Sequence, residues 1–231
     1  VKHESYKVVT GWEAICTKLN HEIESLKGAK KIVVIETYQG VIHEELQQEL
    51  SNGLQHTRFI KAEDLMLWEE EIRKLVFPDV TNDRIFGFLT RLTMDAFFDP
   101  EKVNRIQDEI NTASEGVIVV YGSGAALLCP NPDLLVYADM ARWEIQLRMR
   151  QHLVDNLGVK NRNTADWMLL YKQGYFVDWR VCDRLKKQLF DTWDFVLDTN
   201  KANSPKMVSG NAVLQGLKEA VNRPFSVVPF F

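Results

Sequence analysis

Hydrophobic residues along the chain form short continuous runs, which alternate with segments where apolar positions recur every three or four residues. Continuous apolar runs are typical of strands that are buried on both faces, as in parallel sheets. They predict strands at 32–35, 56–61, 116–121, 134–138 and 195–198.

Helical spacing fills the segments between these runs. It predicts helices at 11–26, 41–50, 62–75, 84–98, 100–111, 140–153, 164–172, 178–189 and 210–222. Asp64, Asp99 and Ser209 carry side chains suited to cap three of these helices, and Pro100 follows at a first helical position. Strands that alternate with helices indicate an α/β protein with three layers, α/β/α, and a mainly parallel sheet of about five strands.

The length of 231 residues suits one α/β domain, which we assign to residues 1–223. The chain lacks an initial Met and ends in an apolar segment that closes with Phe230 and Phe231. We therefore expect residues 224–231 to begin a linker to a following domain. A net charge of −4 argues against a nucleic-acid partner. No stretch approaches the ~20 apolar residues of a membrane-spanning helix, so no membrane partner is expected.

Cysteine and histidine usage bounds the compartment and the metal chemistry. Cys16, Cys129 and Cys182 are far apart and odd in number. This favours free thiols in a reducing compartment, and hence a cytoplasmic protein, over disulfides or a thiolate zinc site. The five His residues are scattered without metal-ligand spacing, so no metal or other cofactor is expected in this chain.

The loop after the first predicted buried strand carries the most informative candidate chemistry. A phosphate-binding loop has the pattern G-x-x-x-x-G-K-[ST], in which backbone amides and the Lys hold phosphates and the hydroxyl holds magnesium. With Gly40 at the second Gly, Ile35 stands at the first, Val41 replaces the Lys and Ile42 replaces the hydroxyl. The helix N-terminus could still attract an anion. An ordinary strand-turn-helix connection explains the same residues.

Ligands of open α/β sheets bind beyond the carboxyl ends of the strands, where the loops 36–40, 121–124, 139–142 and 198–200 would lie. Gly122-Ser123-Gly124 fits either a ligand or close backbone packing, and the Arg residues of 140–150 fit either phosphate or a solvated helix face. The aromatic cluster with Tyr171 and Trp179 fits either an interface or internal packing. No catalytic residue can be assigned. The candidate phosphate or ligand contacts are Glu36, Tyr38, Gln39, Gly40, Ser123, Asp139, Arg142 and Arg148.

Four segments together resemble the N-terminal region of long bacterial class I mannose-6-phosphate isomerase-like proteins. They are residues 117–128 (VIVVYGSGAALL), 133–146 (DLLVYADMARWEIQ), 171–180 (YKQGYFVDWR) and 223–231 (RPFSVVPFF). The resemblance implies that the zinc-dependent isomerase site lies in a C-terminal cupin domain beyond this chain. It also implies that the cupin domain is a partner of the present domain. It also implies a fold similar to P-loop kinases of the uridine-kinase type, with 140–150 as an Arg-bearing lid helix.

Three functions are consistent with these features. The leading hypothesis is a non-catalytic, kinase-like domain that binds a phosphorylated small molecule or packs on the isomerase domain. The second is an active nucleoside or sugar kinase with an atypical phosphate loop. The third is a pure docking module that uses Trp179 and the Phe230-Phe231 tail.

Overall fold

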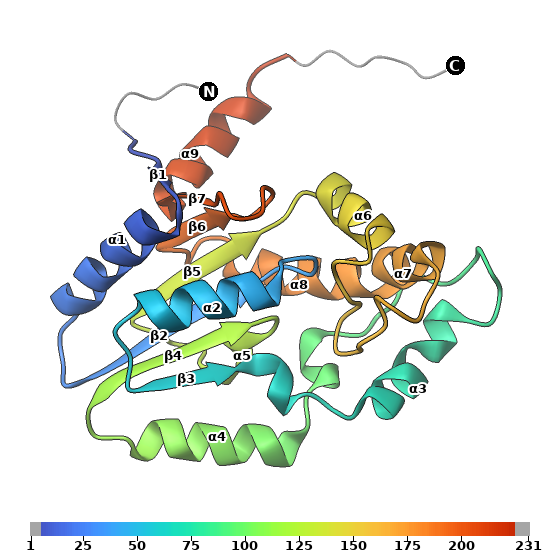
Figure 1. Cartoon of the computed structure of the whole chain (residues 1–231), viewed down its shortest axis with the longest axis horizontal. Coiled ribbons are helices and arrows are strands. Elements are labelled where there is room, and N and C mark those ends of the chain that lie inside the picture. The colour runs from blue at the N-terminus through green and yellow to red at the C-terminus, as the bar shows by residue number, and fades with distance from the viewer. Residues whose placement is uncertain (1–5, 225–231) are drawn as a thin grey trace.

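A computed structural model describes residues 6–224, and the strands within that range form one sheet in the order β1-β7-β6-β5-β2-β4-β3 (Figure 1). Five neighbouring strands, β6-β5-β2-β4-β3, run parallel. The strands are β1 (Val9–Thr10), β2 (Lys30–Thr37), β3 (Arg58–Lys61), β4 (Gly116–Gly122), β5 (Leu134–Asp139), β6 (Phe195–Asp198) and β7 (Lys206–Ser209).

The α/β class and the mainly parallel sheet are confirmed, whereas the predicted number of strands is too low. All five predicted strands are present, and β1 and β7 add an antiparallel edge beside β6. β1 has two residues, and β7 has only two apolar residues, Met207 and Val208, between polar ones, so neither strand forms a marked apolar run in the sequence.

The helices of the described residues lie on both faces of the sheet, with α2 in front of the strands and α8 behind them in Figure 1. Right-handed crossovers explain this arrangement, because the β2-to-β3 connection runs in the opposite direction along the sheet from the later connections. The α-helices are α1 (Trp12–Ser25), α2 (His43–Gly53), α3 (Glu69–Val80), α4 (Pro100–Thr112), α5 (Ala125–Leu128), α6 (Arg142–Arg150), α7 (Trp167–Gln173), α8 (Trp179–Leu189) and α9 (Gly210–Val221).

Two of the three predicted helix caps are confirmed. The Asp99 carboxylate accepts hydrogen bonds from Glu101 N and Lys102 N at the start of α4, and the Ser209 hydroxyl accepts one from Ala212 N at the start of α9. The prediction for Asp64 is wrong, because this residue lies inside a short 3₁₀ turn, Ala62–Leu65. The following helix, α3, begins only after Trp68.

The predicted helix at 84–98 is also wrong. Residues 81–93 are irregular, and only a 3₁₀ turn, Met94–Phe97, follows. The Asp83 carboxylate accepts the amides of Ile85 and Phe86, which are the bonds of a turn. Arg184 binds the carbonyls of Thr90 and Leu92 from α8, so tertiary contacts outweigh the helical spacing. The segment exposes four large apolar side chains, those of Ile85, Phe86, Phe88 and Leu89.

Two predictions concern the chain ends and the membrane. The expected linker at 224–231 lies outside the described residues apart from Pro224. Within residues 6–224, no helix is long and apolar enough to cross a membrane.

Candidate functional site

A cleft of about 720 Å³ opens at the carboxyl ends of β2, β3 and β4, which is the edge of a parallel sheet where ligands bind. Its volume lies within the range of small-molecule sites. The turn after β2 and the start of α2 form one side, and the 153–163 loop, between α6 and α7, forms another. Side chains of α4 and the residues before α3 complete the lining.

The eight candidate residues divide between this cleft and the adjacent strand ends. Gln39, Gly40 and Ser123 line the cleft. The other five do not line it, and three of these make contacts beside β5 and β6. Tyr38 donates a hydrogen bond to Asp183 (2.8 Å), Arg142 pairs with the same carboxylate, and Asp139 pairs with Lys186 (2.6 Å).

The turn after β2 is packed against α6 rather than left open as a phosphate cradle. Gly40 adopts φ +97°, and a Cβ there would lie 2.7 Å from Cγ1 of Ile145. Val41, which stands at the Lys position of the motif, is buried in the core. Glu44 and Glu45 occupy the first turn of α2, so the protein's own carboxylates already complement the helix dipole.

Arg148 fixes this turn through backbone carbonyls. Its buried guanidinium donates to Gly40 O (2.7 Å), Thr199 O (2.6 Å) and Asn200 O (3.1 Å). Burial lowers the pKa of Arg148, because the charged form loses hydration. In this structure the Arg148 side chain joins the loops that follow β2 and β6.

Glu36 lies at the centre of the sheet, opposite Gly122 in β4 and Tyr137 in β5. Its carboxylate is fully buried and accepts hydrogen bonds from Gly124 N and Ala126 N, both at 2.8 Å. Burial raises the pKa of Glu36 to about 8, and the two amide hydrogen bonds only partly oppose this shift.

Glu63 occupies the other side of the Gly122-Ser123-Gly124 turn. Its Oε1 accepts a hydrogen bond from Ser123 N (2.7 Å) and lies 3.2 Å from Nδ1 of His43. Gly122 has φ +116°, and a Cβ there would lie 2.2 Å from Glu63 Oε2. The amides of this turn therefore hold two internal carboxylates, those of Glu36 and Glu63.

A buried network around Asp178 shapes the 153–163 loop. The Asp178 carboxylate accepts hydrogen bonds from Asn156 Nδ2 (2.6 Å) and Leu157 N (3.2 Å). Asn161 exchanges two further hydrogen bonds with Asn156. Burial raises the pKa of Asp178 to about 6, against the lowering effect of these donors. Asp178 acts here as an anchor of the cleft wall.

Gln39 connects the β2 turn to that wall. Its amide donates to Asp155 O (2.8 Å), and its carbonyl accepts from the indole N–H of Trp179 (2.9 Å). Trp179 is only 1% exposed. The predicted aromatic cluster is therefore internal packing at Trp179, and this residue is not available as a docking surface.

The charged residues lining the cleft are balanced in number but unequal in pairing. Five carboxylates and five Lys or Arg side chains line it. Arg162 pairs with Glu44 (2.6 Å) and Asp155 (3.6 Å), while Glu63 has His43 beside it and Glu69 has Arg73 (3.6 Å). Within residues 6–224, Asp64 is therefore the one lining carboxylate without an ion-pair partner. Four lining cations have no such partner: Lys61, Lys102, Arg105 and Lys160.

Sequence reasoning missed these four cations because isolated Lys and Arg residues usually mark solvated surface. It also missed Asn156 and Asn161, whose only signal is a polar cluster in an otherwise irregular loop. In the described part of the chain, no group of three or more His, Cys, Asp or Glu side chains could hold a metal ion.

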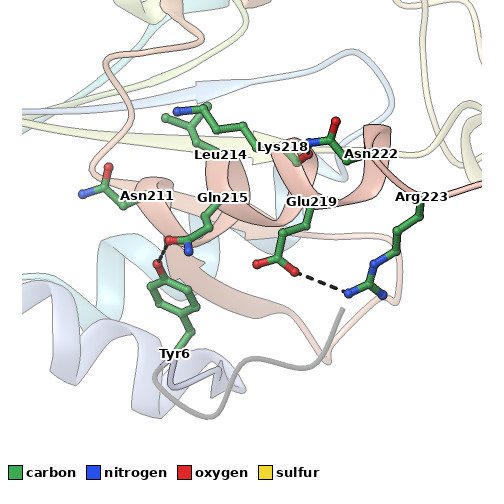
Figure 2. A pocket seen from close by; sticks show the side chains of 8 residues that line it. All are labelled: Tyr6, Asn211, Leu214, Gln215, Lys218, Glu219, Asn222 and Arg223. Atoms are coloured by element: carbon green, nitrogen blue, oxygen red, sulfur yellow. Dashed lines mark hydrogen bonds and ion pairs between the residues drawn. The ribbon is translucent and has the colours of Figure 1, made fainter.

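A second hollow of about 760 Å³ lies along α9, at the other edge of the sheet (Figure 2). Tyr6 donates a hydrogen bond to Gln215 there, and Arg223 pairs with Glu219 (3.5 Å). Among the described residues, α9, the two residues that follow it and Tyr6 supply the lining, and none of the strand-end loops contributes. The cleft beside β2 is therefore the stronger candidate site.

A family model described as a domain of unknown function, DUF8485, matches residues 11–222. The chain belongs to this family. The DUF8485 model assigns no activity and gives no support to the resemblance to mannose-6-phosphate isomerase-like proteins. No curated protein matches the chain.

The solved structures that match this chain include the following two. A putative fructose transport system kinase from Silicibacter sp. TM1040 shares 10% identity with a TM-score of 0.47, over 75% of this chain and 94% of its own. A gluconokinase from Sinorhizobium meliloti 1021 shares 14% identity with a TM-score of 0.38, over 85% and 98%. With TM-scores below 0.5 and identities this low, these two matches assign neither an activity nor a ligand to the chain.

The raised pKa of Glu36 predicts that the DUF8485 domain loses stability as the pH rises from about 5 to 8. In this window the folded protein holds a proton that the unfolded chain has released, so the free energy of unfolding falls, by at most roughly 1.4 kcal/mol per pH unit. Asp178 adds to the fall around its own pKa of about 6. Urea unfolding at several pH values should show a shallower dependence for Glu36→Gln. The exposed control Glu115→Gln should keep the wild-type dependence, and an unchanged slope in Glu36→Gln would contradict the assignment.

The close approach of Glu63 predicts that Gly122→Ala lowers the free energy of unfolding by about 2 kcal/mol or more. The new methyl group needs a strained φ and displaces the half-buried Glu63 carboxylate from its amide donor. Gly216→Ala in α9 is the matched control, since a Cβ there meets nothing within 4 Å and helical Ala is favourable. Equal unfolding midpoints for Gly122→Ala and the wild type would disprove the steric argument.

Proposed function

We propose that this domain binds a phosphorylated small molecule in the cleft beside β2 and does not itself transfer a phosphoryl group. The observation that carries the proposal is the surplus of unpaired cations: among the described residues, Lys61, Lys102, Arg105 and Lys160 line the cleft without an ion-pair partner, whereas four of its five carboxylates have one. Lys and Arg side chains that lack a carboxylate partner favour a phosphate dianion, through charge and through several N–H donors.

The four cations come from three separate elements that face one cleft. Lys61 ends β3, Lys102 and Arg105 lie one turn apart on α4, and Lys160 belongs to the 153–163 loop. A phosphate between these elements would be approached from several directions, as specific recognition requires. The N-terminus of α2 contributes less, because Glu44 and Glu45 already occupy its first turn.

The residues that phosphoryl transfer needs in a P-loop are missing from this site. Val41 and Ile42 cannot replace a Lys charge or a magnesium-binding hydroxyl, and Gly40 O is bound by Arg148. A binding role therefore fits the turn after β2 better than ATP turnover does.

An active small-molecule kinase is the second candidate, and one pair of residues favours it. His43 and Glu63 lie 3.2 Å apart on the cleft wall, with Glu63 oriented by Ser123 N. A His beside a carboxylate is a pair from which the imidazole can accept a proton from a substrate hydroxyl. The association with an isomerase domain stays a prediction.

Binding is tested by thermal unfolding and calorimetry with inorganic phosphate, hexose phosphates and nucleotides. A ligand at about 100 times its Kd should add about 2.7 kcal/mol to the free energy of unfolding. Lys61→Ala/Arg105→Ala should weaken the binding at least tenfold, whereas Lys187→Ala, which removes an exposed lysine of α8, should leave it unchanged. If none of these compounds binds, or if the double variant binds as well as the wild type, the proposal fails.

The two candidates differ in turnover. For the binding role we expect no magnesium-dependent consumption of ATP above the buffer rate with any sugar or nucleoside acceptor. Turnover that disappears in His43→Ala but persists in His21→Ala, a histidine of α1 outside the cleft, would establish the kinase instead.

A further inference from the structure

Trp68 is a large aromatic side chain that the cleft leaves uncovered. It lines the cleft next to Leu67 and Glu69, yet it is 71% exposed. Its backbone is fixed at the start of α3, where Trp68 N donates to Glu71 Oε2 (3.0 Å). An indole held at the rim of a cleft in this way offers a flat apolar surface to whatever enters.

Lys102 covers one face of the indole. Its ammonium lies 4.6 Å from the ring centroid and donates to Met66 O (2.8 Å), so the cation is held in place by α4 and by the backbone before α3. A cation over one face polarises the ring. The high exposure of Trp68 leaves the opposite face free for a second partner.

We propose that Trp68 is a stacking platform for the base of a nucleotide, whose phosphate lies against Lys61 and Arg105. The inference rests on the proposed binding of a phosphorylated molecule and names its class. Every nucleobase has a π-face that can stack on an aromatic side chain. Arg105 lies three residues after Lys102 on the same face of α4, so the ring site and the phosphate site adjoin.

The rest of the lining suits a base better than a bare sugar phosphate. Met66, Leu67 and Val159 supply apolar walls, and Asp64 and Glu69 supply acceptors for exocyclic amino groups. A cleft of about 720 Å³ also has room for a base and a ribose in addition to the phosphate.

Trp143 provides a matched control, because exposed Trp side chains also occur without a binding role. It is 62% exposed on α6 and does not line the cleft. The comparison of Trp68 with Trp143 therefore separates a stacking role from the general effect of removing a surface indole.

The test is calorimetric titration of AMP, UMP and ribose 5-phosphate into the wild type, Trp68→Ala, Trp68→Phe and Trp143→Ala. We expect both nucleotides to bind the wild type at least tenfold more tightly than ribose 5-phosphate. Trp68→Ala should weaken nucleotide binding by roughly 5- to 150-fold and leave ribose 5-phosphate unchanged. Trp68→Phe should restore most of the loss, and Trp143→Ala should bind like the wild type.

The outcomes separate this inference from the proposed function. If ribose 5-phosphate binds as tightly as AMP and depends on Lys61 and Arg105, phosphate binding stands and base stacking is wrong. Base stacking is also wrong if Trp68→Ala binds nucleotides like the wild type, or loses ribose 5-phosphate equally. If none of the three compounds binds the wild type, base stacking is wrong, and the titrations with inorganic phosphate and hexose phosphates decide separately whether the proposed function stands.

Discussion

The buried carboxyl group of Glu36, at the carboxyl end of the central strand β2, fixes the turn on which one wall of the cleft depends. It is fully buried, and it accepts hydrogen bonds from Gly124 N and Ala126 N at the start of α5. These bonds fix the turn after β4, which leaves Ser123 N available for Glu63. Glu63 in turn orders the 3₁₀ turn that leads to Trp68, so the rim of the cleft depends on a group in the core.

The opposite wall follows the same principle with a second buried acid. Asp178 holds the 153–163 loop through Asn156 and Leu157, and Gln39 connects that loop to the β2 turn. Burial of each carboxyl group costs hydration, and hydrogen bonds recover only part of that cost. The walls of the cleft are thus ordered at the expense of stability.

Sequence patterns predict the framework well because the framework obeys local rules. The parallel strands are continuous apolar runs. Asp99 and Ser209 are N-cap residues whose side chains bind amides no more than three residues further along the chain. The segment at 84–98 has the same helical spacing, but Asp83 binds its first amides in a turn, and Arg184 binds its carbonyls from α8, far away in the sequence. The strand-end rule places Gln39, Gly40 and Ser123 in the cleft. Trp68, Lys61 and Arg105 carry no such signal, because only the folded chain brings β3, α3 and α4 to one opening.

Arg148 has a consequence for how the domain opens locally. One guanidinium binds the carbonyls of Gly40, Thr199 and Asn200, so the loops after β2 and β6 share a single cross-link. If one loop detaches while the other stays bound, the buried guanidinium loses part of its hydrogen-bond acceptors. Detachment of one loop alone is therefore unfavourable. Amide hydrogen exchange in the two loops is then coupled into one opening event, although more than 150 residues separate them in the sequence.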